Sequence, residues 1–377
     1  MLLAAVPVAA ESRSAERMTP LLQEVRSAPV PFTGSDGRSH LVYELWLTNF
    51  SSAESVVESV EVLGDGQPLQ KLEGEALAGR LKPGGQGTFG ATLPPSVQGL
   101  LFLHVTLPAG TPVPQKIGHR VTARVLAAPP GQQEITDTGG EVTVDRREAV
   151  LIGPPLHGSG YISADSCCDA VRHTRAALPV NGHVRLAQRF AVDWEQLDEQ
   201  NRIYAGPQAD PRSYAIFGRE ALAVADARVS SVLDGLPEQT PGQYPTNIAL
   251  EEADGNSVIL DLGQGSFALY AHLQPGSLKV RAGDQVKRGQ VLGLVGNSGN
   301  SVAPHLHFHV MDGPSPLDSN GLPYRIDAYQ VTATSPGTAA FDVAEEKGTP
   351  LAIQPLLPAQ RITDALPLDQ LIVQFGE

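Results

Sequence analysis

The sequence predicts a mainly β protein built from two β-rich domains. Apolar and polar residues alternate along many short segments, as in strands that bury one face. Gly and Pro account for 38 and 31 of the 377 residues, above their usual combined share of about 12%, and they divide the chain into short elements. Hydrophobic residues make up 41% of the chain and charged residues 18%, which is enough apolar material for a folded core. These features argue against a long helical bundle or a coiled coil.

We predict the first domain over residues 20–150. Its strands are expected in a series of β-type runs: Leu41–Asn49, Ser55–Leu63, Gly87–Leu93, Gly99–Leu107, His119–Leu126 and Glu141–Val144. Turn signals such as Gly64-Asp65-Gly66 separate the runs. Short strands at a spacing of ~8–12 residues are typical of an immunoglobulin-like β-sandwich. We expect a spacer or binding module, in which His104 is a packing residue within an apolar run rather than a ligand.

The rest of the chain is predicted as a linker, a second domain and a tail. Residues 151–180 are irregular and are expected to form a linker that packs onto the second domain, residues 181–330. Within that domain, Asn256–Leu262 and Phe267–His272 flank Gly263-Gln264-Gly265 and predict a β-hairpin. The tail, residues 331–377, ends in an apolar segment that could add a strand at a sheet edge.

Charge and hydropathy exclude several classes of partner. The formal net charge is −14, whereas a protein that binds nucleic acid needs a basic stripe to displace counterions. No apolar stretch approaches the ~20 residues of a membrane-spanning helix, so no integral membrane segment is expected. Leu2–Ala10 is apolar and ends in small residues, like a secretory signal without its basic start. We therefore predict a truncated signal segment over residues 1–19 and an exported protein of the cell envelope or extracellular space.

The two cysteines, Cys167 and Cys168, are adjacent in the chain. Two cysteines cannot provide a disulfide scaffold or a structural zinc knot. They are expected to be either two semi-buried thiols or one bridge between neighbours.

The most informative segment is Pro304–Val310, in which histidine alternates with apolar residues. Side chains two apart in a strand share a face, so His305, His307 and His309 are expected on one face of a half-buried strand. Imidazoles brought together in this way suppress one another's protonation unless a metal or a polarised substrate compensates. Imidazole nitrogen is a common zinc ligand, and the segment therefore suggests a zinc site.

Four motifs follow one another along the second domain: Tyr270-Ala271-His272-Leu273, Gly283-Asp284-Gln285-Val286, Gly296-Asn297-Ser298-Gly299 and Pro304-His305-Leu306-His307-Phe308. In this order they resemble the core of the M23 peptidases, which are zinc endopeptidases of the LytM or lysostaphin type that cut peptide cross-bridges in bacterial cell walls. The resemblance covers about residues 184–312 and implies an antiparallel β-sheet peptidase domain. It also implies that His307 and Asp193 are zinc ligands and that His305 and His272 have catalytic roles.

One position departs from the family pattern. The family's upstream motif has a zinc-binding His four residues before the Asp, and here that position is Arg189. A guanidinium stays protonated and offers no lone pair to a metal. Arg189 could lie beside Asp193 and replace the charge of the metal. Alternatively, His309, His183 or His173 could serve as the substitute ligand.

The resemblance implies a metalloendopeptidase that acts on peptidoglycan peptides by zinc-assisted amide hydrolysis. The alternative is a catalytically inactive homologue that binds cell-wall peptide or regulates a separate wall hydrolase. A lipoyl or biotinyl carrier is suggested by the spacing in Val280–Gln290, but carriers need a lysine at a hairpin tip in a Met-Lys-like motif. That motif is absent here, and carriers have no use for His-x-His.

Overall fold

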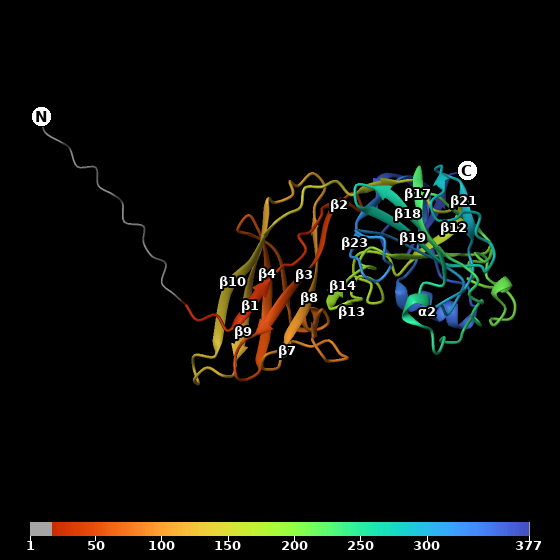
Figure 1. Ribbon diagram of the computed structural model, residues 1–377. Helices are drawn as coiled ribbons and strands as arrows, with labels where there is room; N and C mark the ends of the chain where they lie inside the picture. Colours follow the sequence, from red (N-terminus) through yellow and green to blue (C-terminus); the bar gives the residue numbers. More distant parts are fainter. Residues whose placement is uncertain (1–16, 377) are drawn as a thin grey trace, which may run out of the picture. The chain divides into compact units, whose positions relative to one another are not determined.

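The computed structural model describes residues 17–376 and divides them into two compact units (Figure 1). The first unit contains residues up to Ser27 together with Glu44–Phe102 and Lys116–Thr143. The second contains Ala28–Tyr43, Leu103–Gln115 and the chain from Val144 onward. The predicted signal segment, residues 1–19, lies outside the described residues except for its last three. The prediction of a mainly β chain is confirmed.

Two five-stranded sheets account for the N-terminal third of the chain. One has the order β1 (Leu21–Glu24), β3 (Ser39–Asn49), β8 (Gln98–Leu107) and β6 (Leu81–Pro83), with β2 (Phe32–Thr33) paired to β3. The other has the order β10 (Glu134–Thr143), β9 (Lys116–Val125), β4 (Ser55–Gly64) and β5 (Gln67–Glu73), with β7 (Thr92–Leu93) paired to β4. The short helix α1 (Gly74–Ala78) follows β5.

Strand β9 shows why this part of the chain forms sheets. Ile117, His119, Val121, Ala123 and Val125 alternate with more exposed residues and are all buried, as expected for a strand with one face on a core. The two sheets support the predicted sandwich, and its immunoglobulin-like type stays a prediction.

The second unit is built on a twelve-stranded sheet. Its order is β11 (Val150–Ile152), β24 (Tyr324–Thr334), β26 (Leu371–Phe375), β12 (Gly158–Ala164), β15 (Val192–Gln196), β22 (Leu306–Met311), β19 (Ser266–Leu273), β18 (Asn256–Gly263), β17 (Ala227–Leu233) and β20 (Gln285–Val286). In addition, β23 (Gly321–Leu322) pairs with β22 and β25 (Gln354–Ala365) pairs with β24. The pairing of β11 with β24 is parallel, and the other described pairings in this sheet are antiparallel.

Smaller elements surround this sheet. Two-stranded ladders join β13 (Leu178–Val180) to β14 (His183–Arg185) and β16 (Glu220–Leu222) to β21 (Val291–Leu294). Helix α2 (Thr338–Lys347) and the 3₁₀ turns Pro211–Ser213 and Leu250–Glu252 complete the secondary structure of the described residues. No helix of the described residues is long and apolar enough to cross a membrane.

The structure differs from the predicted linker and tail. Residues 151–180 contribute β12 to the interior of the large sheet, between β26 and β15. The tail contributes β26, which lies between β24 and β12 rather than at an edge. Both strands carry buried side chains, among them Ile162 in β12 and Val373 in β26. Interior positions also satisfy the backbone hydrogen bonds of these strands on both sides.

The centre of the large sheet positions the motif residues. The predicted hairpin is confirmed as β18 and β19, and β22 pairs with both β19 and β15. In this register Asp193 and Ala271 are the two neighbours of His307. The expectation of a half-buried strand is wrong, because every residue of β22 is buried. Its histidine face is covered by side chains such as His173, whose ring packs edge-on against His307 at 4.9 Å.

Candidate metal centre and active site

Neighbouring strands bring a carboxylate and an imidazole into direct contact. Asp193 of β15 and His307 of β22 are register partners, and the Nδ1 of His307 lies 2.8 Å from the Oδ1 of Asp193. His307 is buried, at 3% exposure. Asp193 also lies within 3.4 Å of His173 and His305, so one carboxylate is shared by three imidazoles.

His173 reaches this carboxylate from the segment between β12 and β13. Its Nδ1 donates a hydrogen bond to the backbone carbonyl of Asp165 at 2.9 Å. The other nitrogen, Nε2, therefore faces the Oδ2 of Asp193, at 3.4 Å. Burial lowers the pKa of His173, but the charge of Asp193 outweighs burial and raises it above the usual value. A cation, whether a proton or a metal ion, is favoured between these two groups.

The donor set of His173, Asp193 and His307 fits zinc. One ligand atom from each residue lies within 4.8 Å of the others. Two imidazole nitrogens and one carboxylate oxygen are a usual protein set for catalytic zinc, which keeps a fourth position open. The hydrogen bond from His173 to a backbone carbonyl is the support that metal-binding imidazoles generally have. The three side chains therefore form a candidate zinc site.

Two further imidazoles, His272 and His305, lie beside this donor set. Their ring centroids are 4.7 Å apart. The Nδ1 of His272 donates to the carbonyl of Ser298 at 2.8 Å, and the Nδ1 of His305 donates to the carbonyl of Ala303 at 2.8 Å. Both rings thus hold one proton at Nδ1, and the Nε2 of His305 faces the Oδ1 of Asp193 at 3.4 Å.

The surroundings shift the pKa values of these two rings in opposite directions. Burial lowers the pKa of His272 well below its usual value, and the neighbouring His305 and His307 lower it further. Burial also lowers the pKa of His305, but the carboxylate of Asp193 outweighs burial and raises it to about 9. One ring is therefore neutral and the other protonated near pH 7. Such pairs of titratable groups with separated pKa values are typical of acid–base sites.

The structure places the other predicted residues as follows. The guanidinium of Arg189 donates to the carbonyl of Gly321 at 3.2 Å, whereas Asp193 is contacted by imidazoles. His309 is buried on β22, with its Nδ1 3.0 Å from the Nε2 of His307, on the ring edge opposite Asp193. His183 is exposed on β14 and is not among the grouped donors. Of the three substitutes considered, His173 is the one that the fold brings to Asp193 and His307.

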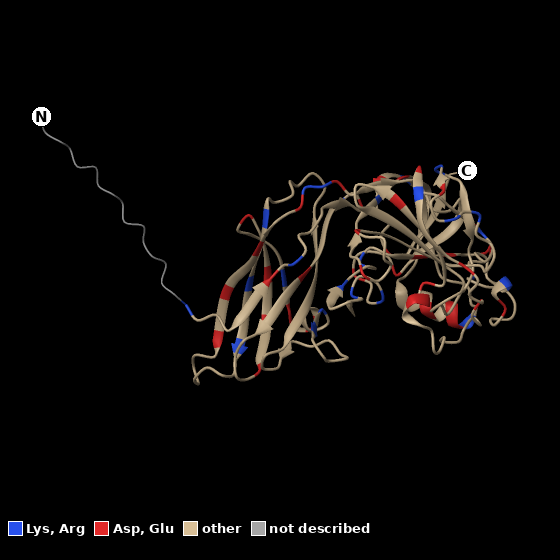
Figure 2. Cartoon of the chain, viewed as in Figure 1, with Lys and Arg blue, Asp and Glu red and all other residues tan. Residues whose placement is uncertain are grey.

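A cavity of about 320 Å³ opens over the five residues His173, Asp193, His272, His305 and His307. Besides Asp165, two further acidic residues that were not predicted from the sequence also line it, namely Glu195 and Glu345. Burial raises the pKa of both, and each also interacts with the other. Glu195 follows Asp193 by two residues in β15, so the shared strand face could have indicated it. Glu345 lies on α2, whose acidic residues are red in Figure 2, and no sequence signal connects it to the cavity.

The glycine-containing loop 296–301 contacts the residues of the site. Besides the carbonyl that holds His272, Ser298 donates its hydroxyl to the carbonyl of Leu273 at 2.8 Å. Asn300 and Ser301 line the cavity. Gly299 has φ of +75°, and a Cβ there would lie 2.5 Å from the Cα of Gly255. Only glycine fits this close approach.

Comparisons with known proteins identify one matching family and several similar proteins. The family described as Peptidase family M23 matches residues 218–319. This range contains His272, His305 and His307 of the cavity, whereas His173 and Asp193 precede it. The peptidoglycan DD-endopeptidase ShyA of Vibrio cholerae is 35% identical over 189 residues, which are 46% of this chain and 42% of the relative. The DD-carboxypeptidase/endopeptidase Mpg of Neisseria meningitidis is 32% identical over 97 residues, 26% of this chain and 21% of the relative. The chain thus spans less than half the length of these curated relatives.

Solved structures include two similar catalytic domains. That of lysostaphin from Staphylococcus simulans has 21% identity and a TM-score of 0.23, covering 44% of this chain and 86% of that one. That of the M23 protein EnpA from Enterococcus faecalis has 18% identity and a TM-score of 0.27, covering 45% and 92%. The family match and the curated relatives thus show that residues 218–319 resemble a peptidase domain of family M23.

Proposed function

We propose that this protein hydrolyses peptide bonds in peptidoglycan peptides at a zinc site formed by His173, Asp193 and His307. The observation that carries the proposal is the convergence of these three donors with His272 and His305 in one cavity. The names of the curated relatives support peptidoglycan as the substrate. A peptidoglycan substrate in turn supports a location in the cell envelope or outside the cell.

His173 takes the place of the ligand that Arg189 cannot provide. It comes from upstream of Asp193 in the chain, as the missing His would, but from a separate loop. Its Nε2 approaches Asp193 from the Oδ2 side, while His307 approaches from the Oδ1 side. The two imidazoles and the carboxylate between them supply the three protein ligands that a catalytic zinc site needs.

The two remaining imidazoles have different roles in proton transfer: His272 accepts a proton and His305 donates one. When bound, zinc supplies a Lewis acid that polarises the scissile carbonyl and lowers the pKa of water to about 7. The neutral His272 accepts a proton at Nε2, because its Nδ1 proton is held by Ser298. The protonated His305 donates from Nε2 toward the oxygen on which negative charge develops. Its Nδ1 proton stays on the carbonyl of Ala303 and keeps the ring in place.

The experiment compares metal content and cleavage of purified peptidoglycan in three proteins. Wild type is expected to hold one zinc per chain and to release peptide fragments. His173→Ala is expected to lose both, because a donor disappears. His183→Ala is the matched control: it removes an exposed imidazole of the same upstream region and should keep both properties.

Two results would contradict the proposal. Wild-type protein without zinc or cleavage would support the alternative of an inactive homologue that binds cell-wall peptide or regulates another hydrolase. His173→Ala protein with full zinc content would show that another residue completes the site.

A further inference from the structure

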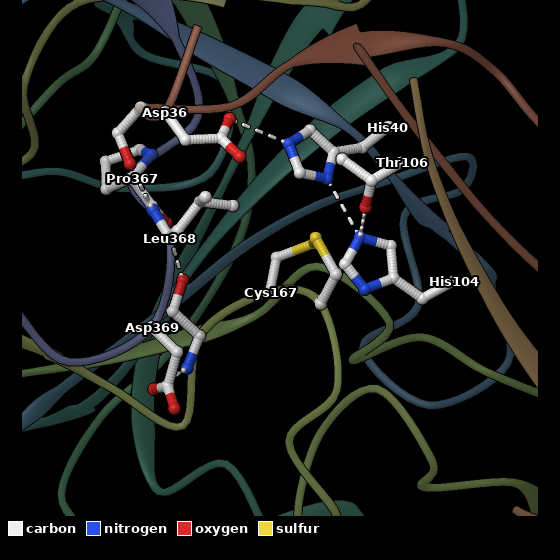
Figure 3. The surroundings of a disulfide bond; sticks show 11 residues. Asp36, His40, His104, Thr106, Cys167, Pro367, Leu368 and Asp369 are labelled. Atoms are coloured by element: carbon white, nitrogen blue, oxygen red, sulfur yellow. Dashed lines mark hydrogen bonds and ion pairs between the residues drawn. A yellow bond between two sulfur atoms is a disulfide. The ribbon is translucent and has the colours of Figure 1, made fainter. Parts of the chain in front are cut away.

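A second cluster of metal-type donors lies in the C-terminal unit and shares no residue with the catalytic cavity. It consists of His40 on β3, His104 on β8 and Cys168 in the segment between β12 and β13. One ligand atom of each lies within 4.8 Å of the other two. His40 and Cys168 are buried, at 2% and 5% exposure. Figure 3 shows the two imidazoles beside the sulfur atoms.

The His40 ring is oriented as a metal-binding imidazole would be. Its Nε2 donates to the Oδ1 of Asp36 at 3.0 Å, which leaves the lone pair of Nδ1 pointing at the Nε2 of His104, 2.8 Å away. Burial raises the pKa of Asp36, but its hydrogen bonds from His40 and from the backbone of Arg38 outweigh burial and lower it. An ionised carboxylate that holds the far nitrogen of a ligand imidazole is a common support of metal sites.

The sulfur donor is blocked by a disulfide. Cys167 and Cys168 are bonded to each other, and a disulfide sulfur carries no negative charge with which to hold a metal. A thiolate, in contrast, is the form of cysteine that binds metals. The expectation of one bridge between neighbours is therefore the alternative that the structure contains, and its reduction would change the chemistry of the cluster.

We propose that reduction of the Cys167–Cys168 disulfide opens a second metal site, in which the Cys168 thiolate, His40 and His104 bind one zinc ion. Thiolate and imidazole donors together favour zinc over magnesium or calcium, which prefer oxygen. In the oxidised protein the two imidazoles alone hold the metal weakly. The site is thus gated by the redox state of the cysteine pair.

The chemistry balances with a dithiol as reductant. The dithiol gives two electrons and two protons, the S–S bond breaks, two protein thiols form, and the reductant closes its own disulfide. On metal binding the Cys168 thiol loses its proton to solvent and a metal–sulfur bond forms. The proton on Nε2 of His104 moves to Nδ1 of the same ring, and Cys167 stays a neutral thiol.

Cobalt(II) is the probe that tests the proposal in the full-length chain. A thiolate bound to cobalt gives a near-ultraviolet charge-transfer band, which the thiol-free catalytic site cannot give. Oxidised and reduced protein are prepared separately, and their thiol content is checked by mass. We expect the band and one additional equivalent of metal in reduced protein only. Asp193→Ala removes a proposed ligand of the catalytic site and should leave the band unchanged. Failure of the proposed catalytic site can therefore be distinguished from failure of the second site.

Two matched variants sharpen the test, because each removes the same disulfide. Cys167→Ser leaves Cys168 as a free thiol and should show the band without reductant. Cys168→Ser should show none in either condition. The proposal is overturned if reduced wild type binds no more cobalt than oxidised protein. It is also overturned if Cys168→Ser keeps the band or Cys167→Ser lacks it.

Discussion

His272 has a backbone conformation that few residues adopt, with φ of +60°. Its backbone N–H donates to Asp254 and its ring to Ser298, so the surrounding structure holds this left-handed geometry in place. Strain of this kind is often found at functional sites. The arrangement fixes one tautomer of the ring and aims Nε2 at the cavity.

Replacement of His272 should separate metal binding from catalysis. We expect His272→Asn to keep its zinc, because His272 is not one of the three proposed ligands, and to lose about 10²–10⁴-fold in kcat. Asparagine tolerates positive φ, so the backbone is preserved. The measurements are zinc content and steady-state cleavage. Loss of zinc in this variant would show that His272 is a ligand instead.

At the scale of elements, the loop 296–301 lies in close backbone contact with Gly255, the residue before β18. Gly299 packs against Gly255, and the adjacent carbonyl of Ser298 orients His272. Gly289 has a similar φ of +80°, but open space lies where its Cβ would be. Substitutions at these two glycines therefore distinguish the effect of steric overlap from the effect of backbone strain.

We expect Gly299→Ala to abolish cleavage, since the overlap with Gly255 must displace the Ser298 carbonyl. Gly289→Ala should lower stability by about 1–2 kcal/mol, the cost of a left-handed non-glycine residue, and keep activity. Thermal melting and cleavage assays check both. Equal losses of activity in the two variants would contradict the positioning role of this loop.

Strand β9 carries a buried imidazole whose charge the fold disfavours. Burial lowers the pKa of His119 from 6.5 to about 4, although hydrogen bonds with the backbone of Gly139 and Gly140 partly raise it. Between these two pKa values the unfolded chain binds a proton that the folded chain does not. Stability is therefore fully present above pH 6.5 and falls as pH decreases toward 4.

The expected loss is about 3 kcal/mol, because each tenfold difference in proton affinity between the folded and unfolded chain is worth about 1.36 kcal/mol. Urea denaturation over a pH series measures this loss of stability. Tryptophan fluorescence follows the unfolding, because Trp46 lies in the same unit as His119. His119→Leu should flatten this part of the pH dependence. An unchanged slope in that variant would assign the effect to other groups.

At the scale of the whole molecule, the C-terminal segment completes the sheet that carries the site. Phe375 of β26 is 1% exposed, and its ring packs against Trp194 at 5.2 Å between centroids. Trp194 is the chain neighbour of Asp193 in β15. Strand β26 therefore supports the strand that provides a proposed zinc ligand.

Phe375→Ala should cost about 3–5 kcal/mol, the usual loss for a buried phenylalanine. Gln374→Ala is the matched control, because this neighbouring side chain is exposed and its loss should change stability by less than about 0.5 kcal/mol. Chemical denaturation gives both values. Similar stability of the two variants would mean that the tail is not part of the core.

The sequence by itself determined the β character of the chain, the hairpin of β18 and β19, and the motif residues His272, His305 and His307. These features are local: alternation, turn residues and short motifs act over a few positions. Only the tertiary structure decided that His173 meets Asp193, that Glu345 lines the cavity and that His40 and His104 meet Cys168. Those residues are far apart along the chain and carry no common period, so their contacts follow from the order of strands in the sheet, which local patterns do not encode.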